Sequence, residues 1–525
     1  MEVKDDFKRT EKSIANAFTG IIGQIIQYIF HYAVRTVFIY NFGKTYLGLN
    51  GLFTNILSIL NLAELGIGTA IIYQLYETIA KKDIEKTKQY LAFYKKVYRV
   101  IGFIVLGIGL AALPILPFII KEKLDRVNIY LIYLFYLANS IFSYWFFAYR
   151  NAIITANQEQ YKTQRITYLL NIISSLVQIF SMVVFKSIYA FLLIPISTTI
   201  ISNLLSGILI GRWYPFIHEP VKGVLSKDEV KLILRNVYSL MLHKLSYIVL
   251  NSTDDVVLSA MAGITIVGIY SNYTLLVGAV LTAIGMMFVS MTASIGNLNI
   301  IGTKEKKLKI YEALNFAHFW LYGVSSVLLY NLLTPFITLW IGDTYLLGDI
   351  TTAIICINFL TKGLRQGTIL FLHACGLFYE SRLAPVVSSI LNILLSIILV
   401  RLLNPYNLAV AGVLIGTIIS ELAVTWWFDG RLVNRKIFEI SPKRYYIKYW
   451  EYIIVTLVSG LATKLVYSLY QFSNPVINLI YMVTVGFAVV NIIFYLIYGR
   501  SSEFKYIYMV FKKKILYRIF KKNKS

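Results

Sequence analysis

Residues 236–263 read NVYSLMLHKLSYIVLNSTDDVVLSAMAG, a stretch long enough to cross a bilayer as one helix. Its interior nevertheless carries Lys244, Asn251, Asp254 and Asp255. At about 100° per residue, Lys244, Asn251 and Asp255 fall within roughly 40° of one another, so a polar stripe follows an otherwise apolar helix. A charge at membrane depth costs about 2.5–3.5 kcal/mol and usually faces a bundle interior or a water-filled cavity. The stripe therefore predicts a functional site.

The composition of the whole chain is that of a membrane protein. Of its 525 residues, 58% are hydrophobic and 14% are charged, and the mean hydropathy is +0.67. This leaves too little polar surface to cover a globule of this size in water, and the 40 Tyr and 32 Phe fit the aromatic enrichment of bilayer interfaces. The first residues, MEVKDDFKRTEKS, lack the apolar core of a removable signal peptide, so we expect a cytoplasmic N-terminus.

Apolar segments recur along the chain, and each is about long enough for one membrane-spanning helix. The sequence therefore predicts an all-α polytopic membrane protein with about fourteen transmembrane helices. The fourteen segments are approximately 15–40, 49–80, 98–120, 128–149, 166–185, 188–211, 236–262, 264–295, 316–341, 351–378, 383–400, 408–427, 450–470 and 476–499.

The distribution of basic residues predicts the orientation. With the N-terminus inside, the cytoplasmic pieces hold 39 of the 50 Lys and Arg, whereas the outer loops and rims hold 6. Loops on the cytoplasmic side are enriched in Lys and Arg, so this split indicates fourteen spans with both termini in the cytoplasm. It also accounts for the formal charge of +24 without nucleic-acid binding.

The order of the segments predicts two similar halves. We expect an N-terminal six-helix lobe at 1–225, a C-terminal six-helix lobe at 226–440, and two extra transmembrane helices with a basic cytoplasmic tail at 441–525. GKTYLG at 43–48 and GITIVG at 263–268 are bounded by glycines at a constant offset of 220 residues. This register predicts an internal repeat, and transporters commonly place their site between such repeats.

The same offset of 220 residues aligns His31 and Arg35, on the first span, with Asn251 and Asp255 in 236–263. The first span therefore carries a second polar stripe at the same depth. Arg35 and Asp255 are thereby predicted at a shared depth. They can form either a structural ion pair that locks the two lobes together or a gate that opens during transport. The sequence leaves both alternatives open.

Other cations are predicted inside spans without an obvious acidic partner, namely Lys244, Lys362 and Arg365. Together with Arg35 they predict a cationic cavity that binds an anionic ligand. Lys464, in the last two spans, is expected to extend toward an interface instead.

A third group consists of candidates for gating or for binding a coupling cation. His31 can titrate near neutral pH, but it can equally serve as a passive hydrogen-bonding group. Glu64, midway along the second span, can hold a cation or make a helix contact. The full set is His31, Glu64, Asp254, Asp255 and Glu421.

Nothing in the sequence favours an enzyme. Neither a GxxxxGK phosphate loop nor an HExxH zinc motif occurs, and Cys356 and Cys375 lack metal-site spacing. The predicted outer loops are short, whereas membrane polymerases and glycosyltransferases tend to carry a large one. We therefore expect no catalytic residues, no metal and no cofactor.

Three stretches carry a family resemblance: YLGLNGLFTNILSILNLAELGIGTAI at 46–71, NSTDDVVLSAMAGITIVGIYSNYTLL at 251–276, and GLFYESRLAPVVSSILNILLSIILV at 376–400 followed by GVLIGTIIS at 412–420. Through them the chain resembles the Wzx-type oligosaccharide flippases, in the polysaccharide transporter family of the multidrug/oligosaccharidyl-lipid/polysaccharide superfamily. FLHACGLF at 371–378 is more neutral than the charged version expected there.

The resemblance implies two six-helix lobes in a V, two extra helices, and a central cationic cavity that alternates between the membrane faces. Its implied substrate is a polyprenyl-diphosphate-linked oligosaccharide, delivered from the inner to the outer leaflet of a bacterial plasma membrane for capsule or other surface polysaccharide synthesis. Expected partners are membrane lipids, a coupling proton or sodium ion, and a polysaccharide polymerase with its glycosyltransferases. The alternatives are a lipid II flippase or cation-coupled drug exporter of the same superfamily and, from a different class, a membrane polysaccharide polymerase.

Overall fold

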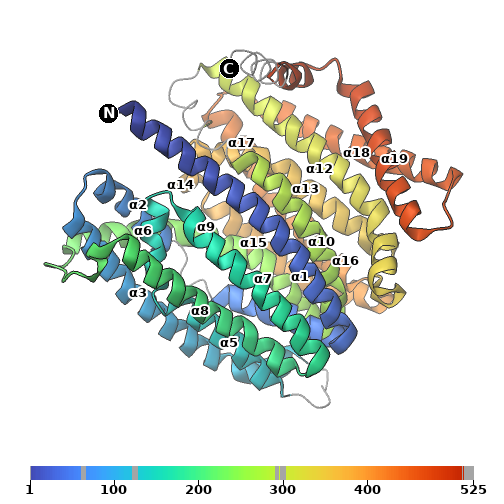
Figure 1. The fold of residues 1–525 in the computed structure, drawn as a ribbon. Helices are drawn as coiled ribbons and strands as arrows, with labels where there is room; N and C mark the ends of the chain where they lie inside the picture. Colours follow the sequence, from blue (N-terminus) through green and yellow to red (C-terminus); the bar gives the residue numbers. More distant parts are fainter. Residues whose placement is uncertain are drawn as a thin grey trace, which may run out of the picture. The chain divides into compact units, whose positions relative to one another are not determined.

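The structure is a computed structural model that describes residues 2–60, 67–120, 128–289, 295, 303–510 and 512 (Figure 1). Throughout these residues the regular elements are helices, and no strand occurs among them. The all-α prediction is therefore confirmed. The chain divides into two compact units, Met1–Gly268 and Ile269–Ser525, called unit 1 and unit 2 below. The lobe boundaries at 225/226 and 440/441 stay predictions.

Unit 1 is built from long helices joined by short turns. Within it α1 packs against α7, α7 against α8, α8 against α5 and α5 against α3, while α9 packs against α1 and α2. Its elements are α1 (Glu2–Leu60), α2 (Ile67–Ala80), α3 (Ile84–Ala111), η2 (Leu113–Ile115), α4 (Leu116–Ile119), α5 (Ile129–Tyr144), η3 (Ala148–Arg150), α6 (Asn151–Ala156), α7 (Gln160–Val184), α8 (Ile188–Trp213), η4 (Pro215–His218) and α9 (Lys227–Ala262).

Unit 2 repeats this style of packing, with α12 and α13 side by side and α15 against α16. Helices α18 and α19 pack on α12. Its elements are α10 (Ile264–Val289), which begins in unit 1, α12 (Lys304–Ile341), η5 (Asp343–Tyr345), α13 (Asp349–Ala374), α14 (Phe378–Ser381), α15 (Leu383–Leu403), η6 (Asn404–Tyr406), α16 (Ala409–Ser420), η7 (Glu421–Trp426), α17 (Trp427–Lys436), α18 (Lys443–Leu469) and α19 (Pro475–Tyr498).

Local sequence signals set several helix boundaries. Gly43 divides α1 because its φ of 78° and ψ of −175° are not helical, and this break separates the first two predicted apolar segments. Ser226 and Glu229 form a reciprocal capping box at the start of α9. Asp83 accepts a hydrogen bond from the backbone N–H of Lys86 and so begins α3.

The number of membrane spans can be compared with the helices of the described residues. Within the described residues, nine helices are long and apolar enough to cross a membrane, or up to ten if the bent pair Ile129–Tyr144 and Ala148–Ala156 is one span. Each of the fourteen predicted segments overlaps a helix, yet the count of fourteen itself is not confirmed. The chain is a multi-pass membrane protein.

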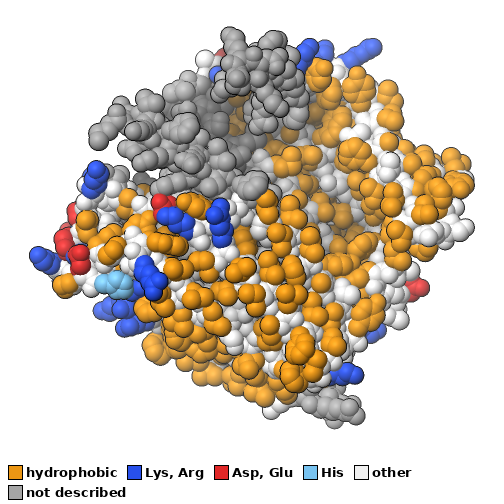
Figure 2. Space-filling model, in the orientation of Figure 1, with side chains coloured by type: hydrophobic (Ala, Val, Ile, Leu, Met, Phe, Trp, Pro, Cys, Tyr) orange, Lys and Arg blue, Asp and Glu red, His pale blue; other side chains and the backbone are white. Residues whose placement is uncertain are grey.

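The surface agrees with a lipid environment. Figure 2 shows hydrophobic side chains over most of the visible face of the described residues, with charged side chains gathered toward its edges. On α7, Leu169, Phe180 and Phe185 just beyond its end are each at least 60% exposed. Apolar side chains left uncovered in such numbers need a non-aqueous surrounding.

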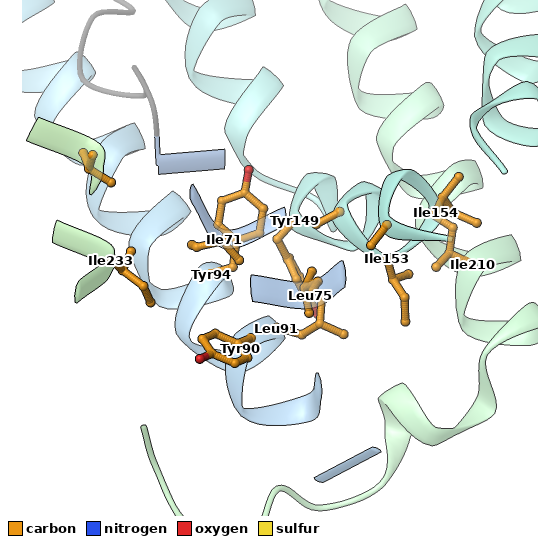
Figure 3. Close-up of a cluster of buried hydrophobic side chains, with 13 residues drawn as sticks. Ile71, Leu75, Tyr90, Leu91, Tyr94, Tyr149, Ile153, Ile154, Ile210 and Ile233 are labelled. Carbon is orange, nitrogen blue, oxygen red and sulfur yellow. The ribbon is translucent and has the colours of Figure 1, made fainter. Parts of the chain in front are cut away.

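A buried cluster holds α2, α3, α6, α8 and α9 of unit 1 together (Figure 3). Burying a side chain such as Leu75 or Ile153 contributes roughly 1.5–3 kcal/mol relative to leaving it in water. The most enclosed members are Ile71, Leu75, Ile153, Ile154, Ile210 and Ile233, each no more than 1% exposed.

Next to this cluster, the segment between η4 and α9 is tied to the first turns of α3. The ammonium of Lys88 lies 2.6 Å from Glu85 and 3.1 Å from Glu219, and the amide of Gln89 donates to the carbonyl of Lys222 at 2.8 Å. Lys86 lies 2.6 Å from Glu229, and its hydrogen bond holds the pKa of that carboxyl below its ordinary value. The segment that links the two sets of predicted spans is therefore attached to unit 1.

The predicted orientation can be tested by single cysteines in a variant in which Cys356 and Cys375 are replaced. Cysteine in place of the exposed Lys96 or Arg435 is expected to resist an impermeant thiol reagent in whole cells, because 81–99 and 428–449 are predicted to be cytoplasmic. Cysteine in place of the exposed Asp349 is expected to react. Labelling at position 96 from outside would overturn the topology.

Candidate functional site

The turns predicted to be equivalent in the two halves contact one another within unit 1. A Cβ added to Gly48 would lie 2.0 Å from the carbonyl oxygen of Ile264, and a Cβ added to Gly268 would lie 1.9 Å from that of Lys44. Gly48 and Gly268 are 220 residues apart, as are Lys44 and Ile264, so the contact is reciprocal. It depends on two positions without side chains.

Two further observations support the 220-residue register. The hydroxyls of Thr45 and Thr265 are 3.1 Å apart, so each lies against its own equivalent. Gly43 and Gly263 both have positive φ, at 78° and 97°, a conformation that glycine adopts without the steric cost other residues incur. At these two turns the register predicted from the glycines is confirmed.

Asp255 is held by a residue that the sequence did not indicate. The side-chain amide of Asn55, on α1, donates to the carboxylate of Asp255, on α9, at 2.6 Å. Arg35 lies on the same helix as Asn55. Pairing of Arg35 with Asp255 stays a prediction. Asn55 was overlooked because a single amide in an apolar run carries no charge.

The remaining predicted site residues of unit 1 are placed only in part. Asp254 is 7% exposed on α9, and His31 is exposed on α1, one turn before Arg35. The side chain of Lys244 and the whole of Glu64 lie outside the described residues. Their predicted roles therefore stay predictions.

In unit 2 a buried arginine lies between two acids. Arg365 on α13 has Nη1 3.7 Å from Glu421 and Nε 3.4 Å from Asp429, and the three side chains are 13%, 10% and 6% exposed, respectively. The expectation that Arg365 has no acidic partner is wrong. The error arose because the charged residue Asp429 was assigned to a cytoplasmic loop.

A π-helical turn explains how the two acids reach one arginine. Residues 421–426 form this turn between α16 and α17. Residues eight apart in an uninterrupted α-helix differ by about 80° around the axis, whereas one inserted residue, as in a π turn, reduces the difference to roughly 20°. Glu421 and Asp429 therefore share a face.

The charge of this group limits what it can bind. One guanidinium against two carboxylates gives a net charge of about −1 when all three are ionised, so Arg365 by itself offers an anion little attraction. Lys362 lies on α13 three residues earlier, on nearly the same face. The hydroxyl of Tyr449 donates to the carbonyl of Thr361 at 3.1 Å and ties α18 to this part of α13.

Comparison with known proteins identifies the family. Residues 11–293, more than half of the chain, match the family described as polysaccharide biosynthesis protein. The chain belongs to this family. None of the curated proteins matches the sequence.

Solved structures show which fold this is. The lipid II flippase MurJ, in an inward closed conformation, is 16% identical, with a TM-score of 0.64 over 91% of this chain and 98% of that one. A MATE-family multidrug transporter in an inward-facing conformation is 15% identical, with a TM-score of 0.61 over 77% of this chain and 94% of that one. A transporter of the same superfamily from Pyrococcus furiosus is 14% identical, with a TM-score of 0.52 over 82% and 97%.

The family and the fold confirm the resemblance to the polysaccharide transporters of the multidrug/oligosaccharidyl-lipid/polysaccharide superfamily. The structural neighbours named above share this fold and are themselves described as transporters or flippases.

Proposed function

We propose that this protein moves polyprenyl-diphosphate-linked oligosaccharide units from the inner to the outer leaflet of the bacterial plasma membrane by alternating access. The observation that carries the proposal is the match of residues 11–293 to the polysaccharide biosynthesis protein family. The fold shared with MurJ, whose substrate is also a lipid-linked sugar, supports it over 91% of the chain. Both termini lie in the cytoplasm in this proposal, and a polysaccharide polymerase with glycosyltransferases works beside it.

The chemistry of the substrate fits the cations within the predicted spans. A diphosphate is bound by Lys and Arg through charge-assisted hydrogen bonds, which strengthen where water is excluded. Arg35, Lys244 and Lys362 are our candidates for that role. Arg365 joins them only if its ion pairs with Glu421 and Asp429 are exchanged for contacts with the substrate.

Coupling to an ion is assigned in the same way. Asp255, held by Asn55 at 2.6 Å, and the adjacent Asp254 are our candidates for responding to a proton or sodium ion, together with His31 and Glu64. Protonation would remove the negative charge of Asp255 and weaken its charge-assisted hydrogen bond. Gating through Glu421 requires its ion pair with Arg365 to open.

The test is the appearance of a labelled lipid-linked oligosaccharide in the outer leaflet of vesicles that contain the purified protein. We expect Lys244→Gln and Lys362→Gln to lower the rate about tenfold or more, since a hydrogen bond to a charged group is worth roughly 1.5–3 kcal/mol. Lys244→Arg keeps the charge and should do less harm.

The matched control is Lys464→Gln, because Lys464 is an exposed cation on α18 whose ammonium lies over the ring of Tyr330. Its rate should stay near that of the unchanged protein. Equal rates in all three glutamine variants would show that these cations do not bind the substrate. If lipid II, or an organic cation, is moved while the oligosaccharide lipid is not, the corresponding alternative replaces our proposal.

A further inference from the structure

The helix pair α5–α6 is broken at its predicted cytoplasmic end by an unusual backbone. α5 ends at Tyr144, and after a bend of 45° the chain continues as η3 and α6. Phe146 and Phe147, at the break, have φ of 53° and 68°. Bulky side chains rarely adopt this left-handed region, and strain of this kind persists only where surrounding contacts impose it, often at binding sites. The break turns Arg150 into the interior.

Arg150 is buried without an acid. It is 7% exposed, and no carboxylate lies within 4.0 Å of it among the described residues. Its Nη1 donates to the carbonyl of Gly207 at 2.7 Å, its Nε donates to the hydroxyl of Tyr149 at 3.4 Å, and its guanidinium carbon lies 4.3 Å from the ring centre of Phe147. These are contacts to neutral groups.

Such contacts pair individual N–H groups but do not neutralise the positive charge of the guanidinium. The partial negative charge at the C-terminal end of α8, worth about half an elementary charge, compensates it only in part. Burying an unpaired cation is costly, so a site of this kind favours an anion. Among the described residues, Nη2 of Arg150 makes no hydrogen bond, and it is not fully enclosed.

A nitrogen of His218 approaches the same part of α8 as the guanidinium of Arg150. A Cβ added to Gly211, on α8, would lie 2.5 Å from Nε2 of His218 and 2.9 Å from Nη1 of Arg150. The glycine thus allows two side chains from different elements to approach the backbone of α8 together. We call Arg150, Gly211 and His218 the Arg150 site.

Two lysines lie near the Arg150 site. The ammonium of Lys95 is 5.9 Å from the ring centre of Tyr149, and that of Lys162, which forms an ion pair with Glu159, is 5.3 Å from the ring centre of Trp213. In Figure 2, Lys and Arg side chains gather with Asp and Glu side chains and a histidine at the left edge, where α3 and α6 lie in Figure 1. The predicted topology assigns these residues to the cytoplasmic side.

An exposed apolar strip lies on α8 about a quarter turn around the helix axis from Gly211. Ile201, Leu205 and Ile208 follow one another at helical spacing and are 45%, 41% and 47% exposed. A ligand with a phosphate and an acyl chain can therefore contact basic groups with one end and this strip with the other. Basic pockets between membrane helices on the cytoplasmic side recognise anionic headgroups in this manner.

We propose that the Arg150 site binds the phosphate of an anionic phospholipid headgroup from the cytoplasmic leaflet, with Arg150 and His218 as its donors. A guanidinium presents paired N–H groups that match two phosphate oxygens, and the strip on α8 favours a lipid over free phosphate. This proposal does not depend on which substrate the protein transports.

The experiment measures the unfolding temperature of the delipidated full-length protein in neutral detergent as phosphatidylglycerol is added, with phosphatidylcholine as the uncharged comparison. We expect phosphatidylglycerol to raise the temperature by several degrees, and high salt to reduce the effect because charge attraction is screened. Arg150→Gln should lose most of this rise, and Arg150→Lys should retain part of it. Arg165→Gln should keep the rise in full, because Arg165 is an exposed arginine near the start of α7, the helix that also carries Lys162.

Further variants keep the result interpretable if Arg150→Gln does not fold. His218→Ala removes the second donor from an exposed position, and Gly211→Ala adds a methyl group that displaces both donors without removing charge. Both should reduce the rise. A rise that is equal in these variants and in Arg165→Gln would overturn the proposal. A rise with inorganic phosphate equal to that with the lipid would overturn the assignment to a headgroup.

Discussion

Replacing Gly268 with alanine is expected to lower the unfolding temperature sharply and to abolish transport. The added Cβ would lie 1.9 Å from the carbonyl oxygen of Lys44 and 2.8 Å from the backbone nitrogen of Gly48, and backbone atoms cannot move aside as a side chain can. Overpacking of a well-packed contact costs about 1–3 kcal/mol, and a backbone clash belongs at the upper end. Gly48→Ala should behave alike, because its Cβ would lie 2.0 Å from the carbonyl oxygen of Ile264.

The control for this prediction is Gly278→Ala on the same helix, α10. A Cβ at Gly278 would meet nothing within 4 Å, and alanine is a better helix former than glycine by about 1 kcal/mol. This variant should be as stable as the unchanged protein or slightly more so. The double variant at positions 48 and 268 should lose less stability than the two single variants added together, because both disrupt one contact. Equal stability of Gly268→Ala and Gly278→Ala would contradict the close contact.

Arg365→Gln is expected to destabilise the protein by about 3–5 kcal/mol, because removing one partner from a buried ion pair leaves uncompensated charge. Here two carboxylates, of Glu421 and Asp429, would remain, at 10% and 6% exposure. Adding Glu421→Gln and Asp429→Asn should recover much of the loss. The measurement is the unfolding temperature in detergent at matched pH and salt.

Arg401→Gln is the matched control, since Arg401 is an exposed arginine at the end of α15 and should tolerate the change. The comparison separates the two roles open to Arg365. A structural ion pair predicts an unstable single variant that the acid substitutions rescue. Direct substrate binding instead predicts a protein that stays stable but transports slowly, and that result would contradict the structural role.

Some of this architecture could be predicted from the sequence because it depends on local signals. Glycines 43 and 263 revealed the two equivalent turns, since a helix break at positive φ favours glycine strongly. Apolar runs located the helices, because each backbone group in a membrane must be paired within its own segment. The spacing of polar residues likewise identified Asp255 as a site residue.

Other features depend on packing that hydropathy does not record. Asp429 was assigned to a cytoplasmic loop because it is charged, whereas the π turn at 421–426 shifts the helix phase by one residue and brings Asp429 beside Arg365. Asn55 became visible only through its hydrogen bond to Asp255. The count of fourteen spans is not confirmed, because among the described residues nine or ten helices are long and apolar enough to cross a membrane.

The reciprocal contact at Gly48 and Gly268 has a geometric implication of its own. Gly48 contacts Ile264, and its equivalent Gly268 contacts Lys44, which is the equivalent of Ile264. Thr45 contacts its own equivalent, Thr265, as residues on a two-fold axis do. This is the isologous arrangement by which two identical subunits associate. A shorter ancestral chain could make the same contact with a second copy of itself, so gene duplication and fusion would join the copies without requiring any new surface.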